Sequence, residues 1–165
     1  MNFYYWNNNK TIMIKIYTDG ACKGNPGPGG YGVYIIYPDG NIEELYGRSE
    51  KTTNNIMELQ ATIVALSHFE EEENITIYTD SKYVKKGITE WVHNWKRNDW
   101  KNAKKQLVKN KELWEELDQW NQFHNVTWEW VKGHSGDPGN DRADYLATFW
   151  KGNILDPFFI LVVLS

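Results

Sequence analysis

The stretch Ile14-Lys15-Ile16-Tyr17-Thr18-Asp19-Gly20 decides the fold class of this chain. It alternates apolar with other side chains and is rich in β-branched and aromatic residues, so it predicts a strand that delivers Asp19 to a loop. A similar ending returns as Ile77-Tyr78-Thr79-Asp80. If the two strands are parallel neighbours, Asp19 and Asp80 project from one edge of a sheet, where open α/β sheets carry their chemistry.

Length and composition indicate one globular domain. The chain has 165 residues, of which 41% are hydrophobic and 24% charged, as is common in soluble proteins. No run approaches the roughly 20 apolar residues of a membrane span, and Met1–Asn7 lacks the pattern of a secretory signal. The single cysteine, Cys22, forbids an internal disulfide, so the cytoplasm is the expected location.

The net charge of −4 hides a strong asymmetry. Between Lys82 and Lys111 lie nine lysines and Arg97 against two acids, Glu90 and Asp99, which is a local charge of +8. The rest of the chain therefore carries −12. A cationic segment on an acidic body predicts a polyanion bound at one place and a cation at another.

Periodicity and turn residues predict further strands and helices around a glycine-rich loop from Asp19 to Gly30 and a hairpin at Pro38-Asp39-Gly40. The acidic run Glu70–Glu73 is interpreted as a solvated helix end. The strands are expected at Ile12–Thr18, Tyr31–Tyr37, Ile42–Tyr46, Ile75–Thr79 and Val126–Lys132, and the helices at Met57–Phe69, Lys82–Lys86, around Leu113–Trp120, and from near Asp141.

The two ends of the chain stand apart from this pattern. Residues 1–11 form an aromatic, Asn-rich extension, residues 12–152 the domain, and residues 153–165 a tail. Three interpretations of the apolar run Phe158–Leu164 stay open: a strand or arm that covers an apolar patch, a surface for self-association, or a liability in expression.

Four acids are candidates for chemistry: Asp19, Glu58, Asp80 and Asp144, expected at two strand ends and two helix starts. Converging carboxylates repel one another unless a cation is present, and oxygen-only ligands favour Mg²⁺ or Mn²⁺ over Zn²⁺. Two such ions roughly 4 Å apart would activate a water and stabilise the leaving oxygen of a phosphodiester. Each acid alone is more commonly a turn former or cap, and spacing does not prove that the set converges.

His134 stands in a loop of small residues. It is either incidental or an imidazole that moves a proton beside a metal centre. Trp91, Trp95 and Trp114, among many lysines, also have two interpretations: they pack a small helical subdomain, or exposed indoles contact a nucleic-acid strand that the lysines bind.

Ordered sequence blocks between about Ile12 and Trp150 carry a family resemblance. They are Tyr17-Thr18-Asp19-Gly20-Ala21-Cys22-Lys23-Gly24-Asn25-Pro26-Gly27, Thr52-Thr53-Asn54-Asn55-Ile56-Met57-Glu58-Leu59, Thr79-Asp80-Ser81-Lys82-Tyr83-Val84, Trp91-Val92-His93-Asn94-Trp95-Lys96, Trp128-Glu129-Trp130-Val131-Lys132-Gly133-His134-Ser135-Gly136, and Asn140-Asp141-Arg142-Ala143-Asp144. With them the chain resembles a type 1 ribonuclease H, the bacterial-type enzyme that cuts RNA paired to DNA.

The resemblance implies a five-stranded mixed sheet of order 3-2-1-4-5, flanked by helices. It also implies an endonuclease that hydrolyses the RNA strand of RNA/DNA hybrids with two Mg²⁺ ions, Mn²⁺ being a substitute, and leaves 3′-hydroxyl and 5′-phosphate ends. Asp19 would serve both ions, Glu58 and Asp80 one, and Asp144 the other, with His134 as a mobile assistant. A catalytically silent hybrid-binding module and a transposase- or integrase-type nuclease are the alternatives, which the intact acid set and the single compact unit respectively disfavour.

The same resemblance implies the substrate contacts. Departures from the common pattern are Lys51 in place of an arginine, Lys82 in place of a glutamine, and an added acid, Asp99. The residues implied to contact the RNA strand are Cys22, Gly24, Asn25 and Ser81, and those implied to enter the minor groove are Asn54 and Asn55. On the DNA strand, the resemblance implies a phosphate pocket formed by Thr53 and Asn110 with Lys51, and a sugar contact made by Trp91. The basic protrusion Trp91–Lys105 is implied to bind the substrate through Trp95, Lys96, Arg97, Trp100, Lys101, Lys104 and Lys105.

Overall fold

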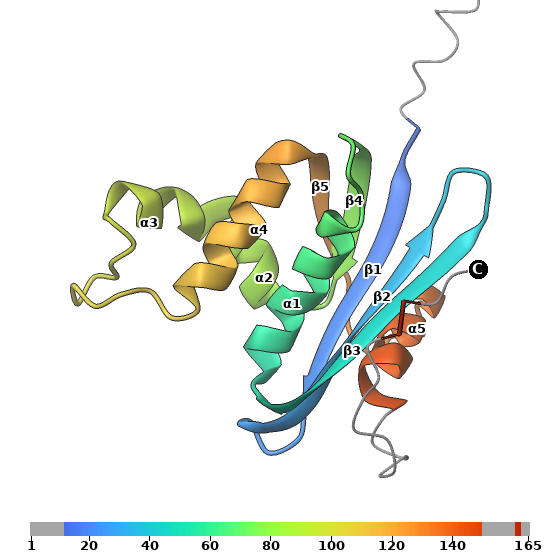
Figure 1. Cartoon of the computed structure of the whole chain (residues 1–165), viewed down its shortest axis with the longest axis horizontal. Coiled ribbons are helices and arrows are strands. Elements are labelled where there is room, and N and C mark those ends of the chain that lie inside the picture. The colour runs from blue at the N-terminus through green and yellow to red at the C-terminus, as the bar shows by residue number, and fades with distance from the viewer. Residues whose placement is uncertain (1–11, 150–160, 163–165) are drawn as a thin grey trace, which may run out of the picture.

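The computed structural model describes residues 12–149 together with Leu161 and Val162. One mixed sheet has helices on both faces, with α1 and α4 on one side and α5 on the other (Figure 1). Its strand order is β5-β4-β1-β2-β3-β6, which confirms the expected 3-2-1-4-5 arrangement and adds a short strand at the β3 edge. The strands are β1 (Ile14–Cys22), β2 (Gly27–Ile36), β3 (Ile42–Thr52), β4 (Asn74–Thr79), β5 (Asn125–Trp130) and β6 (Leu161–Val162), and the helices are α1 (Asn54–Ser67), α2 (Lys82–Lys86), α3 (Val92–Arg97), α4 (Lys111–Phe123) and α5 (Pro138–Thr148), with a π-helical turn at Gly87–Trp91.

The central strand β1 has a different partner on each side. It pairs in parallel with β4 from Ile14 as far as Thr18, which lies opposite Thr79. It pairs antiparallel with β2 as far as Cys22. The expectation that the strand ends before Asp19 is therefore wrong, because hydrogen bonding to β2 carries β1 past the point where β4 stops. Asp19 and Asp80 still come directly after Thr18 and Thr79, the last residues at which β1 and β4 pair.

Helix α1 begins earlier than periodicity predicted. Strand β3 runs to Thr52, beyond the predicted end at Tyr46, because it stays paired with β2. Thr53 then caps α1, and its hydroxyl accepts a hydrogen bond from the amide of Ile56 at 3.2 Å. The helix ends at Ser67, so the acidic run Glu70–Glu73 lies in the connection to β4 and not at a helix end.

Helix α5 also begins before its expected start near Asp141. The side chain of Asp137 accepts a hydrogen bond from the amide of Asn140 at 3.0 Å, and Pro138 occupies the first turn. The cap sits within the glycine-rich sequence that was predicted to be a loop, so the helix takes up the second half of that loop.

The core lies between the sheet and the α1–α4 layer. Ile16 of β1, Ile77 of β4, Leu59 of α1 and Trp114 of α4 have no exposed surface. A core of this kind fixes the positions of β1, β4 and α1 relative to one another. Those three elements carry or precede three of the four candidate acids.

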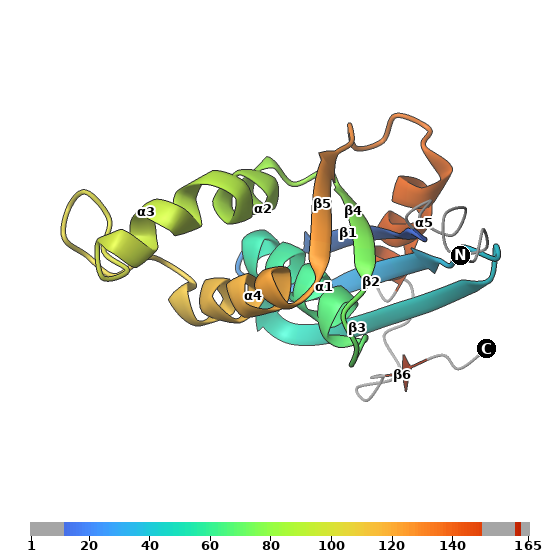
Figure 2. The same ribbon diagram turned by 90° about the horizontal axis from the view of Figure 1, so that it is seen from above.

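The segment from α2 to α3 extends away from the sheet and returns by a long connection to α4 (Figure 2). The Trp95 ring lies 5.3 Å from that of the buried Trp114 and 6.1 Å from that of Trp100, measured between centroids. The Lys96 ammonium lies 2.7 Å from the Asp118 carboxylate and joins α3 to α4. The packing interpretation therefore accounts for Trp95 and Trp114.

Strand β6 pairs antiparallel with β3, placing Leu161 opposite Tyr46 and Val162 opposite Leu45. The predicted extension, residues 1–11, and the rest of the tail lie outside the described residues. Among the residues that the structure describes, no helix has the length and apolar character needed to span a membrane.

Candidate active site

Three carboxylates from separate parts of the chain meet at one edge of the sheet. Asp19 comes from β1, Glu58 from α1, and Asp80 from the residue after β4. One ligand oxygen from each lies within 4.8 Å of the others. This group of three, called here the acid cluster, confirms that Asp19 and Asp80 share an edge.

Close approach of α1 to β1 brings Glu58 into the cluster. The Cα of Gly20 faces the backbone of Met57 and Glu58, and a Cβ at this position would collide with it. The absence of a side chain at Gly20 therefore sets the distance between the strand and the helix. The Gly20 amide also donates a hydrogen bond to Asp19 Oδ1 at 2.9 Å, which orients that carboxylate.

Burial makes the acid cluster electrostatically costly. Asp19 is 5% exposed and Glu58 9% exposed. Burial, followed by the nearby Asp80 carboxylate, raises the pKa of Asp19 to about 8. Burial and then Asp19 raise the pKa of Glu58 well above its usual range. Bringing these acids together as anions therefore requires a compensating cation.

The residues present fit a hard divalent cation. Glu58 Oε2 is buried and has no hydrogen-bond partner among the residues that the structure describes. A buried carboxylate oxygen without a partner is costly, and coordination to a metal ion removes that cost. Because the acid cluster offers only oxygen ligands, its donor set suits Mg²⁺ or Mn²⁺.

Asp144 and His134 flank the acid cluster. Asp144 lies close enough to raise the pKa of both Asp19 and Asp80. It sits in the middle of α5, and Glu58 lies beyond the first turn of α1, so the expected positions of both acids at helix starts are wrong. Burial raises the pKa of Asp80, and the charge of His134 opposes that effect. The His134 side chain is exposed, in the loop between β5 and α5.

Two residues that sequence reasoning did not single out support Asp80. The Cα of Gly133 faces the carboxylate, and a Cβ there would lie 2.6 Å from Asp80 Oδ2. The indole of Trp130 donates a hydrogen bond to the main-chain oxygen of Asp80 at 3.0 Å. In the sequence, the only indication of a role for Gly133 and Trp130 was that both lie in the same family block, Trp128–Gly136, as His134.

The RNase H family model matches residues 11–149, which is most of the chain. This chain belongs to the RNase H family. A ribonuclease H of Parvibaculum lavamentivorans is 58% identical over 135 residues, covering 82% of this chain and 89% of the relative. The sequence resemblance to ribonuclease H is thereby confirmed.

Solved structures agree with the sequence relatives. The crystal structure of LC9-RNase H1, described as a type 1 RNase H with the type 2 active-site motif, has a TM-score of 0.76 and 35% identity, covering 88% of this chain and 74% of that one. The structure of LC11-RNase H1 in complex with RNA/DNA hybrid has a TM-score of 0.60 and 25% identity, covering 82% of this chain and 94% of that one.

In this RNase H, hydrogen bonds join the loop predicted to face RNA to the start of α1. The thiol of Cys22 donates to the main-chain oxygen of Thr52 at 3.3 Å. Asn25 Oδ1 accepts a hydrogen bond from the amide of Asn54 at 3.0 Å. The residues gathered here are Cys22, Gly24, Asn25, Thr53, Asn54 and Asn55, and their contacts with substrate stay a prediction.

Ser81, also predicted to contact RNA, immediately follows Asp80. Its hydroxyl accepts a hydrogen bond from the amide of Val84 at 3.1 Å and so caps α2. Its own amide donates to the hydroxyl of Thr79 at 3.0 Å. These two bonds fix the backbone beside the acid cluster.

The predicted DNA-phosphate pocket depends on a residue that the sequence did not reveal. Thr53 and Asn110 occupy the N-cap positions of α1 and α4, two helices that pack together and begin on the lower side of the view in Figure 1, but only the Thr53 side chain makes a cap hydrogen bond. The Asn110 side chain donates to the Tyr83 hydroxyl oxygen at 3.3 Å, and the Trp114 indole donates to the same oxygen at 3.1 Å. Tyr83 therefore orients Asn110.

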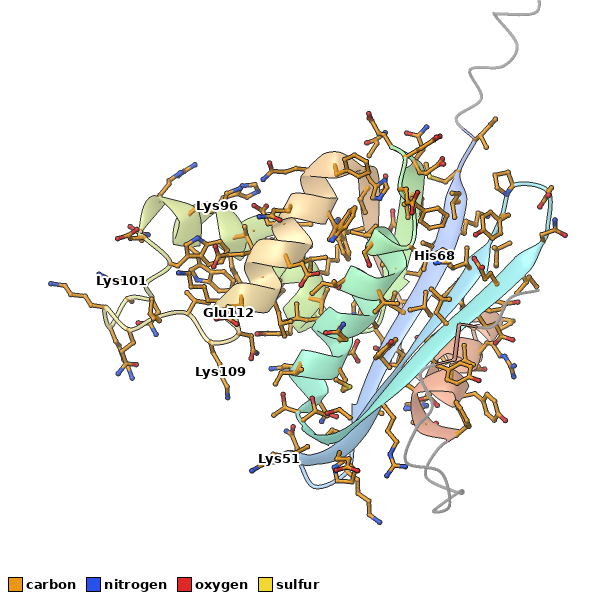
Figure 3. All side chains as sticks on the ribbon, viewed as in Figure 1. Lys51, His68, Lys96, Lys101, Lys109 and Glu112 are labelled. Atoms are coloured by element: carbon orange, nitrogen blue, oxygen red, sulfur yellow. The ribbon has the colours of Figure 1, made fainter. Side chains whose placement is uncertain are left out.

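The cations predicted to bind substrate lie on two separate parts of the surface. Figure 3 shows Lys96 and Lys101 on the protrusion and Lys51 where β3 ends near the start of α1. Trp91 is half-buried, with its ring 6.0 Å from that of Tyr83. The exposed cations on the protrusion are Lys96, Arg97, Lys101, Lys104 and Lys105.

Proposed function

We propose that this chain is a Mg²⁺-dependent endonuclease that hydrolyses the RNA strand of RNA/DNA hybrids and leaves 3′-hydroxyl and 5′-phosphate ends. The observation that carries the proposal is the acid cluster of Asp19, Glu58 and Asp80, two of whose members, Asp19 and Glu58, are buried, in a chain of the RNase H family. The relative LC11-RNase H1, solved with an RNA/DNA hybrid, supports the choice of substrate.

The four acids divide into two overlapping ligand sets. Asp19 lies among Glu58, Asp80 and Asp144, each of which affects its pKa, so it would belong to both ligand sets. Glu58 and Asp80 would complete one set and Asp144 the other. When bound, Mg²⁺, or Mn²⁺ in its place, activates the attacking water and stabilises charge on the leaving oxygen.

His134 is proposed to move a proton at the edge of this site. It is exposed, and its charge acts on Asp80. An imidazole exchanges protons near neutral pH, and an exposed position lets it reach both the site and solvent. Residues around the acid cluster would position the RNA strand of the substrate.

Discrimination between RNA and DNA is proposed to rest on 2′-hydroxyl contacts, because a hybrid offers them on one strand only. Cys22, Gly24, Asn25 and Ser81 would meet the RNA strand, and the bond between Asn25 and Asn54 holds that loop against the start of α1. The remaining proposed contacts are Asn54 and Asn55 in the minor groove, Thr53, Asn110 and Lys51 at a DNA phosphate, Trp91 at a DNA sugar, and Trp95, Lys96, Arg97, Trp100, Lys101, Lys104 and Lys105 along the protrusion.

The proposed catalytic unit spans residues 12–152, between an extension at 1–11 and a tail at 153–165. We propose that it acts as a monomer in the cytoplasm, since its one cysteine, Cys22, is free and suits a reducing compartment. A silent hybrid-binding module is the competing function, and it would have no need for a buried group of unpaired acids.

Asp19→Asn tests the proposal. We expect hybrid cleavage in Mg²⁺ to fall on the order of a thousandfold, because the ligand shared by both metal sets is lost. Binding of the hybrid in EDTA should stay equal near neutral pH, where Asp19 is mostly protonated, and become tighter only above about pH 8, where the wild type carries a negative charge near phosphate. Fluorescence anisotropy in EDTA and gel-based cleavage measure the two effects separately.

Glu71→Gln, which neutralises an exposed acid in the α1–β4 connection, is the matched control and should cleave as the wild type does. RNA/RNA and DNA/DNA duplexes, and the hybrid in EDTA, should remain intact. Normal cleavage by Asp19→Asn, or cleavage of RNA/RNA by the wild type, would refute the assignment.

A further inference from the structure

Lys82 and Trp130 form a cationic platform beside the acid cluster. The ammonium nitrogen of Lys82 lies 5.0 Å from the centroid of the Trp130 ring. Lys82 is exposed, and 39% of the Trp130 surface is exposed to solvent. Trp130 therefore contacts Lys82 through its ring face and Asp80 through its indole N–H, which donates to the Asp80 main-chain oxygen at 3.0 Å.

The position of Lys82 is notable because carboxylates are close by along the chain. Asp80 is two residues away, yet none of the ion pairs among the described residues includes Lys82. An ammonium over an indole face is attracted to the ring and keeps its charge towards solvent. The contact also restricts a side chain that would otherwise lose much rotamer freedom on binding.

We propose that Lys82, held over Trp130, binds a phosphate of the RNA strand adjacent to the linkage that is cut at the acid cluster. Trp130 acts as a positioning residue that fixes both this lysine and the main chain of Asp80. The inference rests on the proposed function, and it adds two residues to the substrate-binding surface.

Charge and position both favour this assignment. The acid cluster repels the phosphates that must approach it, so a cation at its rim lowers the cost of approach. Lys82 follows Asp80 along the chain, and the strand that passes Asp80 is the one that is cut. The nearest phosphate to Lys82 should therefore belong to the RNA strand.

The first test compares Lys82→Gln with Lys86→Gln, which removes an exposed lysine from the same helix, α2. Lys82→Gln should raise the KM for a hybrid about three- to fivefold at low salt, while kcat stays within about twofold. The slope of log KM against log salt concentration should become shallower by about one. Lys86→Gln should match the wild type, and equal KM values for all three proteins would overturn the proposal.

The second test asks whether Trp130 holds the lysine. Trp130→Phe and Trp130→Leu both remove the N–H that binds Asp80, but only Phe keeps an aromatic face. Trp130→Leu should therefore show the KM of Lys82→Gln, and combining the two changes should raise KM no further. Trp130→Phe should keep a KM near that of the wild type. A KM for Trp130→Phe as high as that for Trp130→Leu would refute the positioning role.

The third test identifies the strand. A hybrid whose DNA strand carries neutral methylphosphonate linkages keeps only the RNA phosphates charged. On this substrate Lys82→Gln should still weaken binding by the same factor, measured by anisotropy in EDTA. Loss of that difference would place the contact on the DNA strand and overturn the inference. Failure of the proposed function would appear separately, as no cleavage of any hybrid by the wild type.

Discussion

Asp19 is a buried carboxyl group at the centre of the active site. It lies in the central strand, is almost fully buried, and faces two other carboxylates. Without a cation these surroundings favour its neutral form, which is why its pKa rises to about 8. Metal binding must then displace a proton, so metal affinity and pH are linked at this residue.

This linkage predicts how stability depends on pH in EDTA. The ordinary pKa of Asp19 is 3.8, and in the folded protein it is about 8, so folding favours the protonated form. Its contribution to stability is complete below about pH 4 and is lost as pH rises towards 8. Asp19→Asn does not titrate, so its stability relative to wild type should increase between pH 5 and pH 8, by about 3 to 4 kcal/mol.

Urea unfolding of both proteins in EDTA at several pH values measures this difference. Parallel stability curves would show that Asp19 does not hold a proton in the folded state. Adding Mg²⁺ should stabilise the wild type more at pH 8 than at pH 5, because the ligands are ionised at the higher pH.

A side chain added at Gly133 should disturb the active site and leave the rest of the fold unchanged. In Gly133→Ala the new Cβ would lie 2.6 Å from Asp80 Oδ2, so the carboxylate must rotate or shift. We expect kcat to fall about tenfold to a hundredfold and the half-saturating Mg²⁺ concentration to rise, since small displacements of catalytic groups have effects of this size. Steady-state cleavage across a Mg²⁺ titration measures both.

The thermal midpoint of Gly133→Ala should stay close to that of the wild type, because a side-chain end can move. Gly20→Ala is the contrasting variant, since its Cβ would meet the backbone of Met57 and Glu58. It should lose stability as well as activity. Full activity of Gly133→Ala at low Mg²⁺ would contradict the positioning of Asp80 by this glycine.

Among the elements, the α2–α3 segment and the sheet are built for different tasks. The sheet holds its acids through parallel and antiparallel pairing of β1. The protrusion has little core of its own, but Trp95 packs on Trp114 and Lys96 pairs with Asp118, so its base is fixed to α4. Its outer lysines remain free to meet a polyanion.

Replacing Lys101, Lys104 and Lys105 together by Gln should weaken hybrid binding at low salt and reduce the salt slope by about two to three. The value of kcat should be unchanged, because these residues lie far along the chain from the acid cluster and the protrusion extends away from the sheet (Figure 2). Anisotropy titrations at several salt concentrations give the slope. Changing Lys15 and Lys86, exposed lysines outside the protrusion and the proposed contacts, to Gln serves as the control and should alter the slope less per lysine. An equal loss per lysine would argue against a dedicated role for the protrusion.

Across the whole molecule, charge is divided between a cationic arm and an acidic body. The segment from Lys82 to Lys111 carries +8 within a chain of net charge −4.

Strand β6 lies at the opposite edge of the sheet from β5 and pairs with β3. The pairing is at Leu45 and Tyr46 of β3, whereas Lys51, the β3 residue proposed to contact the hybrid, lies near the end of that strand.

Removing residues 153–165 should leave kcat/KM for a hybrid within about twofold of the full chain, because β3 contributes no acid to the cluster. Loss of β6 leaves the β3 edge unpaired, and unpaired edges favour association, so size-exclusion elution should move to larger species at high concentration. A monomer that elutes unchanged would show that the tail does not protect this edge, and a large loss of activity would show that it supports the active site.

The sequence by itself indicated most of the strands and helices, although not α3, and predicted the strand order through the family resemblance. It also predicted four candidate acids, of which the structure brings Asp19, Glu58 and Asp80 into one cluster. Local signals were sufficient because alternation marks strands and a carboxylate after a β-branched run marks a strand end near chemistry. Boundaries were less accurate. Strand β1 passes Asp19, and α1 and α5 begin before their apolar periodicity does.

Only the tertiary structure decided which residues touch. Pairing of β1 with β2 placed Asp19 inside a strand, and the approach of α1 at Gly20 brought Glu58 within reach. The contacts of Gly133 and Trp130 with Asp80, and of Tyr83 with Asn110, join residues distant along the chain. No periodicity encodes such contacts, because they arise when packed elements bring together side chains whose local sequences are independent of each other.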